Sequence, residues 1–563
     1  MESSSNGAVA RPSHGHFNLG QRLFRGYGPV AVLAALVIVI AVAVPSKVPK
    51  ATNASSNNVS SGSGSDNGVA GSVAGQGTAG SSAGVAAGQT GTVASGGSAG
   101  SAGSTSATAG KVVPCAGAQV PGDPYSPPCI TFSGSNGGAT SKGVTPDTIN
   151  VSWRLTTDQS FQQTLATLAG AQLRDTNEDN KRTALALAQY FNTHFQFYGR
   201  KIKINFFTGQ GALSNELQGY GQPTALADAT SAASIPAFAD MTAGSEPYAT
   251  ALKDQKVLGF GDPYMPAFWH TNHAPYDWSL ATDGTDLATV VANYAVQKLC
   301  PHGTPAAYAG GDVKGKPRKF AGIAPENELY QVSAGVFKTV MEAHGCHVDT
   351  FKYTLDLNTE SQQASNLVAQ LKSQGYTTIL CGCDPIFPVY LTGQGPQQSY
   401  LPEFVEIGAA LVDQDYVGQL YNQDFYAHAF GISPNLPTLP YTQTIGYAAY
   451  KAVNHDEPAF FVNVIYLQMA MMAIGIQMAG PDLTPQNFQK GMFAYPPKLG
   501  PAGLWGFGTN QYTVPNDVRE VCWSRKTISP YNSKVGAYNG TSDQRWTVNG
   551  IPHGPPGCPI PSS

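Results

Sequence analysis

Charged side chains are scarce in this sequence. Asp, Glu, Lys and Arg make up 12% of the 563 residues, and the 32 Lys and Arg are balanced by 36 Asp and Glu, with no basic run in the body of the chain. Proteins that bind nucleic acid concentrate Lys and Arg on one face or along one helix. The shortage of positive charge therefore argues against nucleic acid or another polyanion as a partner.

Motifs for catalysis and for common cofactors are also missing. The sequence contains no Walker A motif, no H-E-x-x-H and no dinucleotide glycine fingerprint, and the lysines at 310–319 lack the P-loop spacing. GGSAG at 96–100 has the letters of a hydrolase elbow, but it lies in a Gly/Ser-rich segment without the strand and helix that the elbow requires. We therefore expect a protein that is not an enzyme and uses no cofactor.

The N-terminal hydrophobic run has no cysteine near its end, which excludes a lipobox, and no small-x-small cleavage site follows closely. Residues 28–44 are uncharged, and three arginines precede them. As a helix this run is about 26 Å long, a little short of the roughly 30 Å hydrocarbon core. We expect an uncleaved transmembrane signal anchor over 28–45 in the cell membrane, with a short cytoplasmic N-terminus over 1–27 and the remaining chain extracytoplasmic.

Large apolar side chains are almost absent from the next segment. Residues 51–113 are nearly all Ser, Gly, Ala, Thr, Val and Asn, a composition that does not offset the entropy cost of ordering the chain. We predict a disordered linker over 46–113. A Gly/Ser coil of about 60 residues has a root-mean-square reach of about 45 Å, so the linker would hold a folded domain off the membrane.

Eight cysteines are present, and all of them follow the hydrophobic run, which favours an oxidising compartment. Cys115 and Cys129 enclose a short loop, so we expect them to form a disulfide. Cys522 and Cys558 are expected to form a second disulfide near the C-terminal end.

Cysteine and histidine also cluster in HGCH at 344–347, CGC at 381–383 and WHTNH at 269–273, which raises a metal site as an alternative. Cys381 and Cys383 point to one face of a predicted strand, so a bridge to another segment, two free thiols and a local bond all remain open. We expect no metal site.

Short β-type runs alternate with amphipathic helices from residue 145, which is the pattern of a parallel sheet built from βαβ units. The predicted strands are 148–155, the end of 198–207, 235–239, 257–260, 320–324, 347–353, 377–382 and 403–408. The fold class expected from this pattern is α/β with parallel central sheets.

Among the helices, 360–374 has the clearest periodicity. Thr359 and Gln362 are placed to form a capping box, and Gly375 suits the position after the helix. The apolar residues at i, i+3, i+4 and i+7 are Ala364, Leu367, Val368 and Leu371.

The uncharged run at 459–480 must be weighed as a second membrane span. One Asn and two Gln interrupt it, and Thr484 with Pro485 begins another ordinary helix close behind. We therefore favour a helix buried between a sheet and its neighbours.

The order of these elements resembles the type I periplasmic-binding-protein superfamily, specifically the branched-chain amino-acid-binding (leucine/isoleucine/valine) receptors of ABC transporters. The likeness covers roughly 144–525. It is carried in the first half by GVTPDTINV at 143–151, ALALAQYFNTHFQFYGRKIKINFF at 184–207 and YDWSLATDGTDLATVVANYAVQKL at 276–299. The lobe-two series that begins with FAGIAPENELYQVSAGVFKTVMEAHG also fits, as do FFVNVIYLQMAMMAI and VREVCW near the end.

The resemblance implies two Rossmann-like lobes joined by three crossovers. Lobe one would comprise 144–283 and 430–510, and lobe two 284–429 and 511–560. The crossovers are expected near 281–286, 427–433 and 505–515, with a terminal strand at 518–523 returning to lobe two. In this framework Cys300 and Cys346 each lie between a helix and a lobe-two strand at one sheet edge, which implies a third disulfide.

The family binds its ligand where the carboxyl ends of the strands of both lobes face each other. Thr242 and Pro263 match the positions that hold a ligand carboxylate, and Asp262 and Tyr264 beside them should face the cleft. The remaining expected ligand-binding residues are Tyr330, which would cover the ligand, and Asp384 on the next cleft loop.

Two positions depart from the family pattern. Met265 stands where the family often has a second hydroxyl. Ala409 and Ala410 follow EFVEIG, where an acidic residue would receive the ligand ammonium, and Asp413 comes only later. Asp384 or Asp262 could supply the anion instead, so the departure places an α-amino acid ligand in doubt.

The function implied is an extracytoplasmic solute-binding protein that captures a small molecule, amino-acid-like or a related polar solute, between two closing lobes. Its expected partners are the solute, an ABC permease, and the membrane through the N-terminal helix. The alternative is a membrane-tethered ligand-sensing receptor domain that signals to an envelope partner. A cytoplasmic piece of 27 residues is too short for a signalling module, which favours transport.

Overall fold

The computed structural model describes residues 110–158, 160–169, 175–261, 264–300 and 304–561. The predicted cytoplasmic N-terminus (1–27) and membrane anchor (28–45) lie outside the described residues, as does most of the predicted linker. The expected ligand-binding residues Asp262 and Pro263 also lie outside them.

A hairpin begins the described chain. Strand β1 (Lys111–Ala118) pairs antiparallel with β2 (Pro128–Ser133), and a disulfide between Cys115 and Cys129 joins the two strands. The predicted linker extends to residue 113, and this boundary is wrong because the chain from Lys111 onward already pairs with β2.

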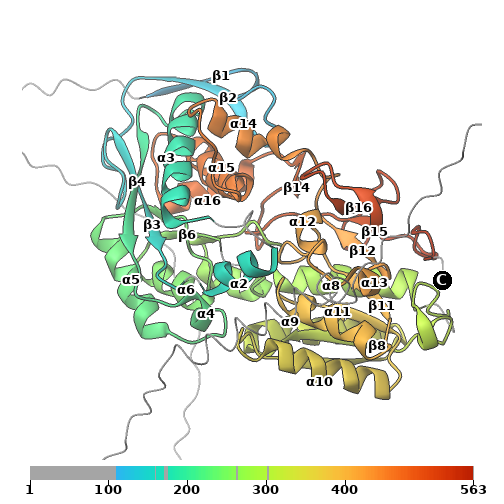
Figure 1. Ribbon diagram of the computed structural model, residues 1–563. Helices are drawn as coiled ribbons and strands as arrows, with labels where there is room; N and C mark the ends of the chain where they lie inside the picture. Colours follow the sequence, from blue (N-terminus) through green and yellow to red (C-terminus); the bar gives the residue numbers. More distant parts are fainter. Residues whose placement is uncertain (1–109, 159, 170–174, 262–263, 301–303, 562–563) are drawn as a thin grey trace, which may run out of the picture. The chain divides into compact units, whose positions relative to one another are not determined.

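The first sheet has five parallel strands in the order β4-β3-β5-β6-β7. Its strands are β3 (Thr148–Leu155), β4 (Lys201–Thr208), β5 (Ala239–Asp240), β6 (Leu258–Phe260) and β7 (Asp277–Trp278). Helices α3 (Asn177–His194) and α15 (Val462–Ala479) cover one face, and α5 (Gln222–Ser234) and α6 (Glu246–Asp254) cover the other (Figure 1). We call this sheet with its helices lobe one.

The second sheet has seven strands in the order β16-β15-β12-β11-β10-β8-β9. Five of them are parallel: β8 (Phe320–Pro325), β9 (Val348–Tyr353), β10 (Thr378–Cys381), β11 (Glu403–Glu406) and β12 (Ala429–Ser433). Strands β15 (Arg519–Ile528) and β16 (Val535–Gly540) add an antiparallel edge. The predicted class, α/β with parallel central sheets, is confirmed.

Helices cover both faces of this second sheet, and the sheet and its helices together form lobe two. Helices α8 (Gly284–Lys298) and α9 (Glu328–Ala343) pack on one face, and α10 (Glu360–Ser373) and α11 (Phe387–Gln397) pack on the other. Each face therefore has its own apolar core, as expected for a doubly covered parallel sheet.

Three segments connect the lobes: 279–283 between β7 and α8, 434–444 between β12 and α14 (Ile445–Lys451), and 506–518 between β14 (Gly503–Trp505) and β15. The predicted crossover at 427–433 is wrong. These residues contain β12, which is buried throughout because it lies between β11 and β15.

The strongest helix predictions are confirmed, apart from one cap. Helix α10 matches the predicted 360–374, and Gly375 has the left-handed backbone (φ 74°) expected after it. The capping box is wrong: the Thr359 hydroxyl donates back to Asp356 and accepts from the side chain of Gln363, but not from a backbone N–H of the helix. Among the described residues only α15 is long and apolar enough to cross a membrane, and most of it is buried in the lobe-one core.

All eight cysteines are described, and they form four disulfides: Cys115–Cys129, Cys300–Cys346, Cys381–Cys383 and Cys522–Cys558. Three of these pairs are the ones favoured from the sequence. For the CGC segment, the structure selects the local bond among the three alternatives, and the cysteines of HGCH and CGC are thereby unavailable as thiolate ligands.

A buried ion cluster holds the loop after β4 and helix α5 against β3. The guanidinium of Arg154 donates to both carboxylate oxygens of Glu216 at 2.8 Å and to Asp228 at 3.2 Å, and lies over the ring of Tyr248. Asp228 also accepts from the backbone N–H groups of Gln210 and Gly211. Each of these charges is buried, so each depends on the others for compensation.

Arg154→Met is expected to lower the free energy of unfolding by about 3–5 kcal/mol, because it leaves two buried carboxylates without their cation. Urea unfolding measures the change. The matched control is Lys181→Met, which breaks a surface pair with Glu178 and should cost no more than about 1 kcal/mol. Equal effects for the two variants would contradict the role given to the cluster.

Candidate ligand-binding site

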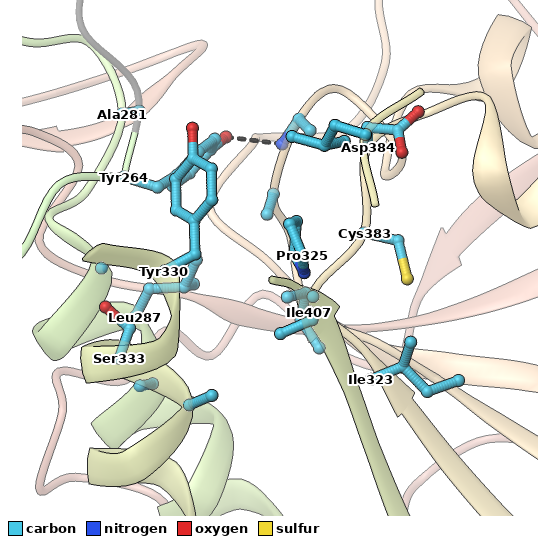
Figure 2. A pocket seen from close by; sticks show the side chains of 18 of the residues that line it. Tyr264, Ala281, Leu287, Ile323, Pro325, Tyr330, Ser333, Cys383, Asp384 and Ile407 are labelled. Atoms are coloured by element: carbon cyan, nitrogen blue, oxygen red, sulfur yellow. Dashed lines mark hydrogen bonds between the residues drawn. The ribbon is translucent and has the colours of Figure 1, made fainter. Parts of the chain in front are cut away.

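A cavity of about 530 Å³ lies between the two lobes. Most of its lining is apolar. Lobe one and the first connection between the lobes contribute Ser214, Leu217, Gly261, Tyr264, Ser279, Leu280, Ala281, Val464 and Gln468. The main contributors from lobe two are Leu287, Ala288, Val291, Ile323, Pro325, Tyr330, Gln331, Ser333, Ala334, Phe337, Phe351, Leu355, Leu357, Glu360, Cys383, Asp384, Ile407 and Ala409–Leu411. Part of this lining is drawn in Figure 2.

The position of the cavity follows from parallel strand pairing. Strand β8 ends at Pro325, β10 is followed by Cys383 and Asp384, and β11 is followed by Ile407, and all four residues line the cavity. The carboxyl ends of parallel strands lie at one edge of a sheet, which is where such folds bind ligands. Gly261 follows β6 in the same way from lobe one.

A hydrogen bond crosses the cavity between the lobes. The backbone N–H of Ala410, after β11, donates to the hydroxyl of Tyr264 in lobe one at 2.5 Å, as the dashed line in Figure 2 shows. Tyr264, Ala410 and Leu411 have φ values of 60°, 49° and 64°, in the left-handed region that residues with a Cβ rarely adopt. Burial raises the pKa of Tyr264, so its own O–H proton stays available for donation.

Asp384, an expected ligand residue, lines the cavity but is already engaged by its own lobe. Its carboxylate accepts from the hydroxyl of Tyr353 at 2.7 Å and from the backbone N–H groups of Ile386 and Phe387 at 2.7 and 3.2 Å. In Figure 2 the carboxylate points away from Tyr264. Burial raises the pKa of Asp384, and these donors counteract the shift. Its main role is to hold the loop between β10 and α11.

Two polar side chains in the cavity lack partners. Glu360 Oε2 and Ser333 Oγ are buried, and neither has a hydrogen bond among the described residues. Burial, together with the negative charge of Asp384, raises the pKa of Glu360 to about 9. The Glu360 carboxyl group is therefore protonated at neutral pH and can both donate and accept a hydrogen bond.

Neither residue was among the expected ligand contacts. Glu360 is the first residue of the predicted helix, a position where an acid is ordinary. Ser333 carried a usable signal: Tyr330, Ser333, Ala334 and Phe337 follow the i, i+3, i+4, i+7 spacing of one helix face, and all four line the cavity.

The other expected residues are placed as follows. Tyr330 lines the cavity and also packs against the lobe-one core beneath α5 and α6. Thr242 is not part of the lining: its hydroxyl donates to Asp240 at 2.7 Å and accepts from the backbone N–H of Arg154. Asp413 also lies outside the lining and accepts from Ser433.

No protein-family model and no curated protein sequence matches the chain. In structure it is similar to the leucine-, isoleucine-, valine-, threonine- and alanine-binding protein from Brucella ovis, at 13% identity and a TM-score of 0.48 over 74% of this chain and 100% of that one. It is also similar to a solute-binding protein of an ABC transporter from Rhodopseudomonas palustris BisB5 in complex with 3,4-dihydroxybenzoic acid (12% identity, TM-score 0.49, 71% and 98%). A third similar structure is a fatty acid ABC transporter substrate-binding protein from Thermomonospora curvata (12% identity, TM-score 0.47, 72% and 94%). These neighbours are type I periplasmic binding proteins, the class that the sequence resembles.

The unfolding free energy should depend on pH through Glu360. An acid whose pKa is raised in the folded state binds more protons there, so the stability of the native protein falls as pH rises from about 5 towards 9. Glu360→Gln removes this loss. The Glu360→Gln variant should be more stable than the native chain at pH 8, and the difference should disappear near pH 4. Thermal unfolding at the two pH values measures this difference. Glu328→Gln, at the exposed first position of α9, is the control and should show no such trend.

Tyr264→Phe should weaken the contact between the lobes, because it leaves the Ala410 N–H without its acceptor, a loss of about 1–3 kcal/mol. We expect a larger radius of gyration in small-angle X-ray scattering of the unliganded protein. Tyr220→Phe changes a tyrosine that is 63% exposed and should leave the radius unchanged. An unaltered radius for Tyr264→Phe would show that the hydroxyl does not hold the lobes together.

Proposed function

We propose that this chain is an extracytoplasmic solute-binding protein that captures a small molecule between its two lobes and delivers it to an ABC-type importer. The observation that supports the proposal most is the cavity itself. It lies at the carboxyl ends of parallel strands, it is lined by both lobes, and a hydrogen bond crosses it. Its volume lies within the range of about 300–1,000 Å³ that is usual for small-molecule sites.

The two-lobed lining gives a physical basis for capture and release. A ligand in the cavity contacts Tyr264 and Leu280 from one lobe and Ile323, Phe337 and Ile407 from the other only when the lobes are close together. The ligand therefore binds the closed arrangement better than an open one and shifts the population towards it. A permease that recognises the closed arrangement would then receive loaded protein.

The chain organisation fits delivery at a membrane surface. Four disulfides suit an oxidising compartment outside the cytoplasm. The anchor at 28–45 and the linker after it, both part of the proposal, would keep the domain near its transporter. We place lobe one at 144–283 and 434–510, and lobe two at 284–433 and 511–560, with the second boundary set after β12.

Filling the cavity should abolish ligand capture. Ala334→Phe places an aromatic ring in the lining, so full-length protein carrying it should retain less small-molecule material, detected by mass spectrometry after extraction, than the native protein retains. A ligand at 100 times its dissociation constant should stabilise the native protein by about 2.7 kcal/mol and the variant by far less.

The control is Val332→Phe on the same helix, where the side chain is 39% exposed and does not line the cavity. It should behave like the native protein in both measurements. Identical extracts and identical thermal shifts for Ala334→Phe and the native protein would contradict the proposed function.

A further inference from the structure

In the part of the chain that the structure describes, the cavity lining offers no positive charge to a ligand. The described residues that line it include no Lys, Arg or His, whereas two of them, Glu360 and Asp384, are acids. A ligand carboxylate placed there would lose its hydration without gaining an ion pair, and it would face the charge of Asp384.

Backbone amides at helix N-termini are the usual substitute for a cation, and here the chain uses them itself. At the start of α8, Asp283 accepts from the backbone N–H groups of Thr285 and Asp286 at 3.0 and 2.9 Å, and the N–H of Gly284 donates to the carbonyl of Met265 at 2.8 Å. The N-terminus of α8 lines the cavity but has no free donor among these three groups.

Three other helices of lobe two that begin at the cavity also have first-turn N–H groups engaged within the protein. Asp384 accepts from the first N–H groups of α11, and Asn327 accepts from the N–H of Leu329 at the start of α9. At the start of α10, the Glu360 N–H donates to the carbonyl of Asp356 at 3.0 Å. Among the described residues, a ligand anion therefore finds no cationic side chain in the lining, and these helix-terminal amides are already engaged.

What the cavity does offer is a large apolar wall and a few uncharged polar groups. Ser333 Oγ and Glu360 Oε2 are buried in the lining and have no hydrogen-bond partner among the residues that the structure describes. A hydroxyl, amide or carbonyl group on a ligand would satisfy either. The raised pKa of Glu360 keeps that carboxyl group neutral, and both Asp384 oxygens already accept hydrogen bonds. Among the described lining residues, the carboxylate available to a ligand cation is therefore that of Asp384, and the three hydrogen bonds it already accepts reduce what it can offer.

We infer that the solute is an uncharged, mainly apolar molecule with one or two hydrogen-bonding groups, which Ser333 and Glu360 recognise in the cavity between the lobes. This inference rests on the proposed function. An aliphatic or ring-bearing alcohol, amide or ketone has this chemistry. An α-amino acid, with two charges to neutralise, does not.

Three probes with the same chain length test the inference: octanamide, octanoate and octylammonium. Displacement of the uncharged dye Nile red from full-length protein at pH 7 gives their relative affinities. We expect octanamide to bind at least tenfold more tightly than either charged probe. Tighter or equal binding of octanoate or octylammonium overturns the inference.

Variants of the two polar residues test how the ligand is recognised. Glu360→Leu removes the hydrogen-bonding group, whereas Glu360→Gln keeps one of similar shape, so Leu should weaken octanamide binding about fivefold more than Gln does. Ser333→Ala should weaken it about threefold. Equal octanamide affinities for the Leu and Gln variants overturn the assignment of Glu360.

Failure of the inference and failure of the proposed function give different results. Charged probes that bind the native protein and Val332→Phe at least as tightly as octanamide, but do not bind Ala334→Phe, overturn only the inference, because the cavity still captures a solute. Dye and probe binding that is absent, or that is unaffected by Ala334→Phe, overturns both.

Discussion

Parallel strand pairing is the constraint on which the rest of this structure depends. In a parallel sheet every strand ends at the same edge, so the loops after β8, β10 and β11 lie together, and the loop after β6 comes from lobe one in the same manner. Because the chain crosses between the lobes three times, a ligand that joins these edges contacts segments far apart in the sequence. The cavity is therefore a product of topology, and its chemistry is decided by the few residues that follow each strand.

At this edge, several backbone N–H groups at helix N-termini bond to side chains of the protein itself. Asp283, Asn327 and Asp384 each cap a helix that begins at the cavity, which leaves side chains such as Leu287, Ile323 and Ile407 to form the wall. Capping satisfies the amides without outside help, and the same caps remove the donors that an anionic ligand would need. The caps that stabilise these helices are thus the same groups on which the inferred preference for an uncharged solute depends.

The sequence predicted the periodic elements well and the site only in part. The spacing of apolar residues located α10 and the strands β3, β8 and β9 to within a residue or two, because each has a clear periodicity. Strand β12 was mistaken for a crossover, since the five-residue AFGIS carries no alternation that separates a central strand from a connecting segment. Thr242 was expected at the ligand by resemblance, but its hydroxyl is committed to Asp240. Contacts between segments that are distant in the sequence decide which hydroxyl or carboxyl group lacks a hydrogen-bond partner. A local sequence pattern cannot predict such contacts.

The hydrogen bond between Tyr264 and Ala410 lies where the backbone is strained. Tyr264, Ala410 and the following Leu411 all have left-handed backbones. Each such residue costs of order 1–3 kcal/mol unless surrounding contacts compensate. A single hydrogen bond contributes about 0.5–1.5 kcal/mol, so this bond alone does not offset the strain of Tyr264, Ala410 and Leu411. The remaining compensation comes from other contacts around these residues, such as the backbone bonds from Val412 to Ala409 and from Gln414 to Leu411. Under the proposed function, a ligand that adds contacts at this strained boundary would contribute to the compensation, and closure of the lobes would then depend on whether the cavity is occupied.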